Sequence, residues 1–408
     1  MDVEDTITDL RQRLRRYGPD RYPIQHATAQ FHLGVALLSA GQADEAAAAL
    51  RAAAAIFDPD RLPVEHAKAT NMLGAALRQL GELKEAAEAF QGAAKTFEAH
   101  SQEQEHAAAL FNLGLVQRES GDAEAASECF RQAWTRFAEH RLPGQATSAA
   151  RELGTTLLAR GELDAAADTL AQATDLAAQV GDYAAVGSAA NALGLAHLGL
   201  GRTQEALEAF RQAAVAHPRT VRPEGFAMAK ANLAIAYEQD GDGPRARLAA
   251  RQALAVGDAP EPVRVQASGV LERLGTQADD LLVVLDQEPA DRWAPIVREE
   301  VVRWADEDPD QRRAALGAWV DGQVARPDRG ADLAEAWLDV LLELPPEVFE
   351  TMIRATLEVL PERDEATVDR FRSDVSRAMV RFHVPQWLRL KDTFNRIAGE
   401  LDQEPSWG

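Results

Sequence analysis

The sequence predicts an all-α fold, in which a helical solenoid of repeated units is followed by a smaller acidic helical domain. The first observation is a Leu-Gly pair that recurs every 40 residues from Leu33-Gly34 to Leu193-Gly194 and continues as Leu233-Ala234. The second is a set of alanines that recurs at the same interval later in each unit. The third is that no stretch of the sequence shows the apolar-polar alternation typical of strands. A fixed period of this length indicates an array of similar helical units.

Composition and charge narrow the class of protein. The chain has 408 residues, of which 46% are hydrophobic and 26% charged, so it can bury a core and is neither disordered nor fibrous. Its net charge of -22 disfavours nucleic acid and acidic membranes as partners, because both are bound through clustered Lys and Arg side chains. The single cysteine, Cys129, excludes an intrachain disulfide framework and a Cys-rich zinc site, and we expect it to be a small buried hydrophobe.

The amino terminus predicts a cytoplasmic location. Residues 1–5 are acidic and no apolar run follows them, so we expect no signal peptide. No window of the sequence approaches the roughly 18 consecutive apolar residues that a membrane span needs. We therefore expect a soluble protein without a membrane partner.

The chain is expected to begin with half of a repeat. Residues 6–16 form a predicted helix with Leu10 and Leu14 on one face. The segment 17–34 aligns with 57–74 at the same 40-residue interval. Residues 1–25 are therefore interpreted as an amino-terminal half-repeat cap.

Residues 26–260 are expected to form six repeats of 40 residues. In each repeat, a first helix carries the Leu-Gly pair and a glycine with positive φ ends it. A second helix then carries two alanines seven residues apart on one face, so that the two antiparallel helices can approach closely. The turn glycines are Gly41, Gly81, Gly121, Gly161, Gly201 and Gly241, and the first alanines are Ala46, Ala86, Ala126, Ala166, Ala206 and Ala246. The larger side chains between the alanines are Leu50, Phe90, Phe130, Leu170 and Phe210.

This pattern of Leu-Gly in the first helix and Ala, Phe and Ala in the second resembles the tetratricopeptide repeat (TPR) family. The resemblance covers residues 26 to about 257. The 40-residue period, and Gly181-Asp182-Tyr183 before Asn191-Ala192-Leu193-Gly194, look most like the longer-repeat subclass. That subclass includes kinesin light chain, spindle-orientation adaptors and the bacterial peptide-sensing Rap regulators. The resemblance implies a right-handed solenoid whose first helices line a concave groove for a peptide.

The 40-residue register ends near residue 260. Residues 261–288 are expected to form a capping helix pair, and residues 289–408 an acidic, Trp-rich helical domain of no family that we can assign. Six of the seven tryptophans lie after residue 288, and residues 261–408 hold 31 acidic and 18 basic side chains. We expect these tryptophans to be core residues, and we expect several helices that begin at proline or acidic residues.

The resemblance also implies which residues face the groove. These are the residues two before and two after each repeated leucine, together with cations five residues away. The partner-binding candidates are Phe31, Lys68, Asn71, Arg78, Phe111, Leu115, Arg118, Arg151, Asn191 and Leu195. Their mixture of apolar and cationic side chains predicts a protein or peptide partner with acidic and apolar character. Self-association of the chain is a further possibility.

Two sets of residues invite a metal-site interpretation that we reject. His26, His66 and His106 recur at the period, but helices of successive repeats stand about 10 Å or more apart, too far to share one ion held at about 2 Å. Helix-start hydrogen bonding or loop packing explains them better. Asp306, Asp308 and Asp310 match only the start of a calcium loop and are expected to favour the helix that follows. We expect no metal, no cofactor and no catalytic residues, since no nucleotide-binding or hydrolase motif is present.

The sequence therefore predicts a non-catalytic protein-protein interaction scaffold or adaptor of bacterial type. The first alternative is a peptide-responsive regulator of the Rap type, in which the ligand closes the superhelix. The second is an enzyme with its site in the carboxy-terminal helical domain, which would need a deep polar pocket with converging titratable groups in residues 289–408.

Overall fold

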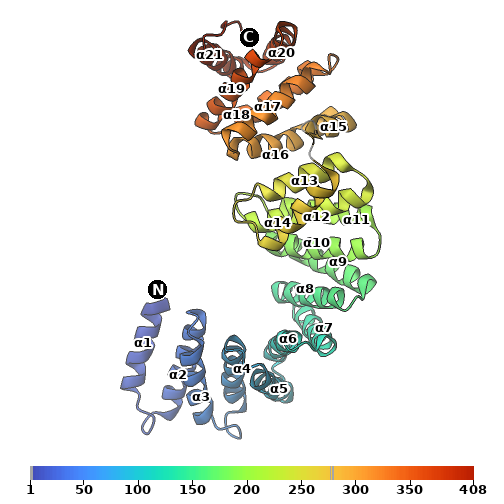
Figure 1. Ribbon diagram of the computed structural model, residues 1–408. Coiled ribbons are helices and arrows are strands. Elements are labelled where there is room, and N and C mark those ends of the chain that lie inside the picture. The colour runs from blue at the N-terminus through green and yellow to red at the C-terminus, as the bar shows by residue number, and fades with distance from the viewer. Residues whose placement is uncertain (1–2, 276, 278–279) are drawn as a thin grey trace. The chain divides into compact units, whose positions relative to one another are not determined.

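The chain is built from helices throughout the part that its computed structural model describes, which is residues 3–275, 277 and 280–408. Those residues form 21 α-helices and two short 3-10 helices and include no strand (Figure 1). The predicted all-α repeat solenoid is confirmed. The described chain divides into two compact units, Met1–Ala216 and His217–Gly408, which we call unit 1 and unit 2.

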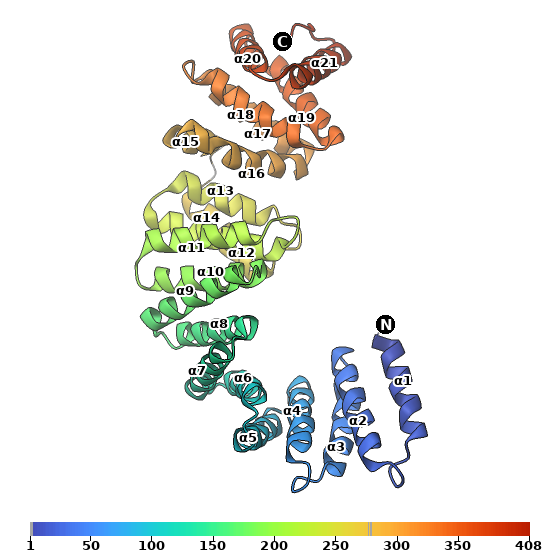
Figure 2. The ribbon, with the colours of Figure 1, turned by 180° about the vertical axis from the view of Figure 1, so that it is seen from behind.

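Unit 1 contains the opening half-repeat and the first five repeats. Its helices lie side by side along the array from α1 to α11 (Figures 1 and 2). They are α1 (Val3–Arg16), α2 (Pro23–Ser39), α3 (Ala43–Ile56), α4 (Pro63–Gln79), α5 (Leu83–Ala99), α6 (Glu103–Glu119), α7 (Ala123–Glu139), α8 (Pro143–Ala159), α9 (Leu163–Gln179), α10 (Tyr183–Gly199) and α11 (Thr203–Ala216).

Each helix of unit 1 packs against the next helix in the chain. The first helices of the repeats, α2, α4, α6, α8 and α10, have 17 residues each, and the second helices have 14 or 17. First helices also contact first helices, as α2 does α4 and α8 does α10. Unit 1 is therefore a two-layered array in which one layer consists of first helices.

The close approach that the small residues predict is confirmed. Gly194 of α10 faces the ring of Phe210 on α11 so closely that an added Cβ atom would lie 2.4 Å from a ring carbon. The equivalent glycines of the other four repeats face Leu50, Phe90, Phe130 and Leu170 in the same way. The repeated alanines of the second helices, Ala126 among them, are fully buried. Only a residue without a Cβ atom fits at this contact.

The predicted turn glycines also have the expected conformation. The six glycines that follow the first helices have φ between 71° and 86°, a region that L side chains rarely adopt. The second helix begins two residues after each of these glycines. In the third repeat the Asp122 side chain caps that helix by accepting from the backbone N–H of Ala125. The short turn makes the two helices of a repeat antiparallel.

Where a second helix has only 14 residues, a longer loop with a proline leads to the next repeat. The His66 ring closes one such loop, since its Nδ1 lies 2.9 Å from the backbone O of Phe57 and 3.0 Å from that of Ala54. The Nδ1 of His26 lies 2.7 Å from the O of Tyr17 in the preceding loop. Loop packing at the helix start is confirmed for these two histidines.

Unit 2 begins with the sixth repeat and continues to the end of the chain. Its α-helices are α12 (Pro223–Asp240), α13 (Gly243–Leu254), α14 (Glu261–Leu274), α15 (Asp280–Gln287), α16 (Trp293–Asp306), α17 (Pro309–Val324), α18 (Gly330–Glu343), α19 (Pro346–Val359), α20 (Glu365–Met379) and α21 (Val384–Glu400). The 3-10 helices are η1 (Ala290–Arg292) and η2 (Leu360–Glu362).

The two helices expected to cap the sixth repeat have different neighbours. Helix α14 packs against α12 and α13, as a first helix of a further repeat would. Helix α15 packs against α13, α16 and α17. Thus α14 extends the 40-residue array, whereas α15 packs both against that array and against the helices that follow.

The helices after α15 show a second period, which the sequence analysis did not find. Their main contacts join every second helix, so α16, α18 and α20 form one layer and α17, α19 and α21 the other. Fully buried side chains recur every 37 residues in both layers. They are Val297, Ala334 and Phe371; Val301, Leu338 and Val375; Leu316, Ile353 and Leu390; and Val320, Leu357 and Phe394. The carboxy-terminal region is therefore a second helical array of three helix pairs.

The tryptophans of this region are core residues, as predicted. Trp293, Trp304, Trp319, Trp337 and Trp407 are buried in one hydrophobic cluster, and Trp387 is half-buried against it. Trp407 follows the last helix and packs against the rings of Phe371 and Phe394, at centroid distances of 6.3 and 5.0 Å. The end of the chain thus covers the apolar surface between α20 and α21.

The limits predicted for the domains stay a prediction. The division between compact units falls at residues 216 and 217, inside the 40-residue array, whereas the sequence analysis placed boundaries at residues 260 and 288. None of the described helices is long and apolar enough to cross a membrane.

Candidate functional site

The predicted partner-binding residues all lie on the first helices of unit 1. Residues spaced by three or four positions share one face of a helix, so Phe111, Leu115 and Arg118 form a row along α6. Arg151 lies on α8, and the remaining members lie on α2, α4 and α10. We call these ten residues, which the sequence analysis assigns to the groove, the groove face. They are Phe31, Lys68, Asn71, Arg78, Phe111, Leu115, Arg118, Arg151, Asn191 and Leu195.

The apolar members of the groove face rest on the core of the array. Phe31, Phe111 and Leu115 are half-buried, and the ring of Phe111 lies 5.6 Å from that of Phe130, which is fully buried. Leu195 on α10 is 38% exposed. Each therefore has one side held by the core and one side at the surface.

Two asparagines of the groove face are almost buried. Asn71 is only 7% exposed, and its side-chain oxygen has no hydrogen-bond partner among the described residues. Asn191 occupies the equivalent position on α10 and is also buried. A buried amide oxygen without a donor is unfavourable by about 1–3 kcal/mol, so Asn71 can accept a hydrogen bond at a gain in free energy.

The cations of the groove face are paired with carboxylates that the sequence analysis did not identify. The Lys68 ammonium on α4 lies 3.4 Å from a Glu105 carboxylate oxygen on α6. The Arg78 guanidinium donates to Glu119 at 2.9 Å, again from α4 to α6. Both are exposed pairs of one positive and one negative charge, so they leave no net charge and contribute little to stability.

A third cluster differs in its charge and burial. Glu152 of α8 accepts from Arg118 of α6, and its carboxylate lies 2.7 Å from the guanidinium of Arg151 on its own helix. The Glu152 side chain is only 9% exposed, whereas those of Arg118 and Arg151 are 37% and 34% exposed. The Arg118 guanidinium also lies 6.0 Å from the centre of the Phe130 ring. One buried carboxylate therefore holds two guanidiniums at the surface.

The three glutamates could have been found from the period. A position in one repeat lies beside an equivalent or neighbouring position in the next, about 40 residues further on. Arg78 and Glu119 are 41 residues apart and Arg118 and Glu152 are 34 apart. Comparing charges between neighbouring repeats, rather than within each repeat, identifies these pairs.

The single cysteine is not a reactive group. Cys129 is half-buried on α7 and donates to the side-chain oxygen of Gln117 at 3.1 Å. Burial raises the pKa of its thiol to about 11, and Glu128 and Asp122 act in the same direction. A thiol with so high a pKa is protonated near neutral pH and is a poor nucleophile.

Unit 2 has an open cleft of about 720 Å³ between α13, α16 and α17. Its charged side chains are paired with one another, since Arg303 donates to Glu300 at 2.7 Å and also to Glu307, and Arg251 donates to Asp280 at 2.7 Å. Burial raises the pKa of Glu307, against the opposing effect of Arg303. The carboxylates that line this cleft, Glu300 and Glu307, thus both pair with Arg303.

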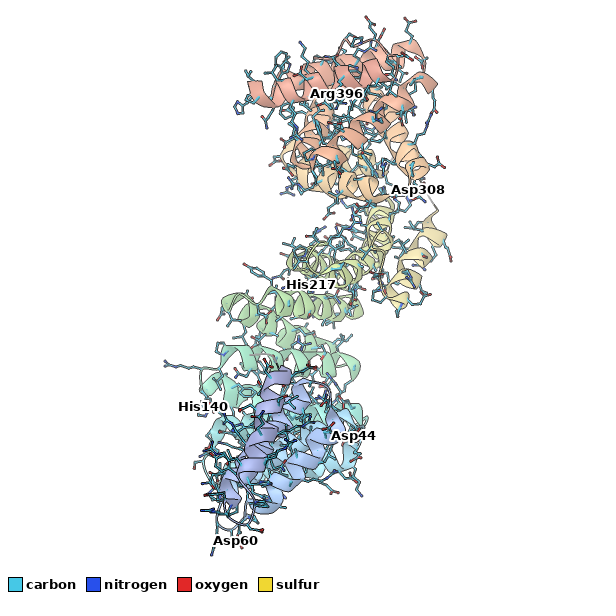
Figure 3. All side chains as sticks on the ribbon, turned by 90° about the vertical axis from the view of Figure 1, so that its left-hand side faces the viewer. Asp44, Asp60, His140, His217, Asp308 and Arg396 are labelled. Carbon is cyan, nitrogen blue, oxygen red and sulfur yellow. The ribbon has the colours of Figure 1, made fainter. Side chains whose placement is uncertain are left out.

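The aspartates that resemble a calcium loop have a structural role. Asp308, which Figure 3 labels, precedes α17. Its side-chain oxygen accepts from the backbone N–H groups of Asp310 and Gln311. It is thus the cap of that helix, as expected for an aspartate at the positive end of a helix dipole. Within the described ranges, no group of three or more His, Cys, Asp or Glu side chains could hold a metal ion.

Comparison with known families identifies the array. Two sequence models described as tetratricopeptide repeat match the chain, one at residues 145–214 and the other at residues 7–61, 60–103, 71–133 and 191–262. Together these ranges cover more than half of the 408 residues. The chain belongs to the tetratricopeptide repeat family. The matches to this TPR protein end at residue 262, where the 40-residue period also ends.

Several solved structures also match part of this chain, each at a TM-score below 0.5. The TPR-like repeats of a putative kinesin light chain from Podosopora anserina share 20% identity, with a TM-score of 0.42, over 48% of this chain and 96% of that one. Pseudomonas aeruginosa pilF shares 17%, with a TM-score of 0.46, over 60% and 97%. Aspartyl phosphate phosphatase F from Bacillus subtilis shares 19%, with a TM-score of 0.41, over 60% and 61%. A comparison with curated proteins finds no match.

Proposed function

We propose that this TPR protein is an interaction scaffold that binds a peptide segment on the groove face between α6 and α8. The binding residues are Phe111, Leu115 and Arg118 of α6 and Arg151 of α8. The observation that carries the proposal is the pair of half-exposed guanidiniums that share one buried carboxylate beside two half-buried apolar side chains.

The charge of this cluster favours an acidic ligand. Arg118 and Arg151 carry two positive charges and Glu152 carries one negative charge, so one positive charge remains. Each guanidinium uses one terminal nitrogen on Glu152, which leaves further N–H groups for a second carboxylate. Guanidinium groups bind carboxylates through several parallel hydrogen bonds, so an Asp, Glu or chain-terminal carboxylate is the expected partner.

The spacing along α6 predicts the sequence pattern of the ligand. Phe111 and Arg118 are seven residues apart, which is about 10 Å along a helix. An extended peptide covers about 10 Å in three residues. We therefore expect a ligand in which an acidic residue and a bulky apolar residue are separated by two or three positions.

The net charge of the chain and its expected location narrow the class of partner further. We propose a non-catalytic adaptor role in the cytoplasm, with an acidic and apolar protein segment as partner, and no nucleic acid or membrane among the partners. Excess negative charge on the chain repels phosphate backbones and acidic headgroups.

Selection from random peptides tests the proposal without knowledge of the natural partner. Peptides displayed on phage are selected on the wild-type chain and on the variant Arg118→Glu/Arg151→Glu. The wild type should enrich acidic residues two or three positions from Leu, Phe or Trp, and the variant should not. The matched control is Lys95→Glu/Arg131→Glu, which makes the same charge change at exposed positions of the second helices α5 and α7. Equal enrichment on all three proteins would place the binding site elsewhere.

One observation favours the peptide-responsive regulator as a second candidate. The ion pairs Arg78–Glu119 and Arg118–Glu152 join first helices of successive repeats across the groove face. A ligand carboxylate that pairs with these arginines in place of the glutamates would change the contacts between repeats and hence the curvature of the array. Small-angle scattering with a selected peptide distinguishes the two, because a regulator should show a lower radius of gyration and a rigid scaffold an unchanged one.

A further inference from the structure

We infer that Glu152 is an internal counter-ion that makes the Arg118–Arg151 site selective, excluding free anions and admitting carboxylates that are attached to an apolar segment. This inference rests on the proposed function of the groove face. It assigns to Glu152 a specificity-determining role and not a direct contact with the ligand.

The position of Glu152 supports this role. Its carboxylate is much more buried than either guanidinium, and it bridges two helices, because Arg118 comes from α6 and Arg151 from α8. A buried carboxylate interacts more strongly with its partners than an exposed one, since the surrounding dielectric constant is lower. Glu152 therefore holds the two guanidiniums at the surface of unit 1.

Competition with Glu152 explains the selectivity. An anion that binds the guanidiniums must share them with a carboxylate that is tethered beside them at a high effective concentration. A small anion such as sulfate binds only through electrostatic attraction and hydrogen bonds to the guanidiniums. A peptide carboxylate gains additional free energy when a neighbouring apolar side chain is buried against Phe111 and Leu115. The site thus discriminates by requiring both contacts.

The other ion pairs of the groove face provide a comparison within the same molecule. Arg78 pairs with Glu119, and the two side chains are 35% and 33% exposed. This pair has one cation for one carboxylate. Like the Glu152 cluster it connects two first helices, here α4 and α6. Removing the Glu119 charge frees a single exposed guanidinium, whereas removing that of Glu152 frees two that lie together.

Binding of inorganic sulfate tests the inference by titration calorimetry at constant ionic strength. Glu152→Gln keeps the shape of the side chain and removes its charge, so sulfate should bind about tenfold more tightly, or better, than to the wild type. Glu119→Gln, the matched control, should change sulfate affinity less than about threefold, as expected for an exposed pair. Adding Arg118→Gln and Arg151→Gln to Glu152→Gln should remove the gain.

The result that overturns the inference is a folded Glu152→Gln variant that binds sulfate no better than the wild type does. If that variant does not fold, Glu152→Met replaces it, since methionine removes the same charge with an apolar side chain of similar length at this buried position of α8. It should also bind sulfate more tightly, and an unchanged affinity would overturn the inference. Failure of the proposed function would be seen separately, as an absence of enriched peptides on the wild type.

Discussion

Gly194 lies against the ring of Phe210, where an added Cβ atom would be 2.4 Å from the nearest ring carbon. Gly194→Ala should therefore force apart the two helices of the fifth repeat and reduce the free energy of unfolding by about 1–3 kcal/mol. Urea unfolding followed by circular dichroism measures this change.

The matched control is Gly92→Ala. Gly92 lies in the interior of α5, and an added Cβ atom there would meet no other atom within 4 Å. Alanine is a better helix former than glycine by roughly 0.5–1 kcal/mol, so this substitution should stabilise the chain. A Gly194→Ala variant as stable as the wild type would show that the helix pair is not closely packed at this position.

His106 makes the stability of unit 1 depend on pH. Burial lowers its pKa, with help from Arg136, while Glu98 and Glu103 act in the opposite direction. In the unfolded chain its pKa is about 6.5, so between the two values the unfolded state binds more protons and stability falls as the pH falls. The Tm of the wild type should decrease more than that of His106→Gln between about pH 7.5 and 5.5. Parallel decreases in the two proteins would contradict the assignment.

Individual side chains show where sequence reasoning is strong and where it is incomplete. The glycine positions could be predicted because steric rules depend only on the local period. The same period places Arg118 and Arg151 on first helices, where the structure has them. The carboxylate partner of Arg118 could not be placed from a single repeat, because Glu152 belongs to the next repeat and its burial is seen only in the folded array.

At the scale of elements, the last eight residues stabilise the second array. Trp407 is fully buried between Phe371 and Phe394, and its backbone N–H donates to the Asn395 side chain at 3.0 Å. Trp407→Ala should lower the free energy of unfolding of unit 2 by about 3–5 kcal/mol, because it leaves a large cavity. Denaturant unfolding followed by fluorescence measures this effect, with Ser406→Ala at an exposed neighbour as the control. Equal midpoints for the two variants would mean that the tail does not cover the core.

The second array shows why element types are easier to predict than their assembly. Proline and acidic helix starts identified helices such as α17 and α19 from the sequence. The 37-residue period could not be recognised in the sequence because no glycine or aromatic residue recurs with it. It is seen only in apolar positions of changing size, such as Val320, Leu357 and Phe394. Such positions become recognisable when the structure shows that all of them are buried.

For the whole molecule, the division into two units predicts unfolding in more than one step. Six of the seven tryptophans lie in unit 2, so fluorescence reports mainly on that unit, whereas circular dichroism reports on helices of both. The two transitions should have different midpoints in urea, since a helical array need not unfold as one cooperative unit. Trp134→Phe, which removes the only tryptophan of unit 1, should leave the fluorescence transition unchanged. Coincident transitions would contradict this account.

The central claim is that an acidic group of a peptide ligand binds between Arg118 and Arg151. A double-mutant cycle tests it most directly, with the acidic residue of a selected peptide replaced by its amide and Arg118 and Arg151 replaced by Gln. We predict a coupling free energy of about 0.5–3 kcal/mol between the peptide carboxylate and the two arginines, as is typical of groups in contact. Strictly additive effects on Kd would contradict the claim, because they would show that the carboxylate and the guanidiniums do not meet.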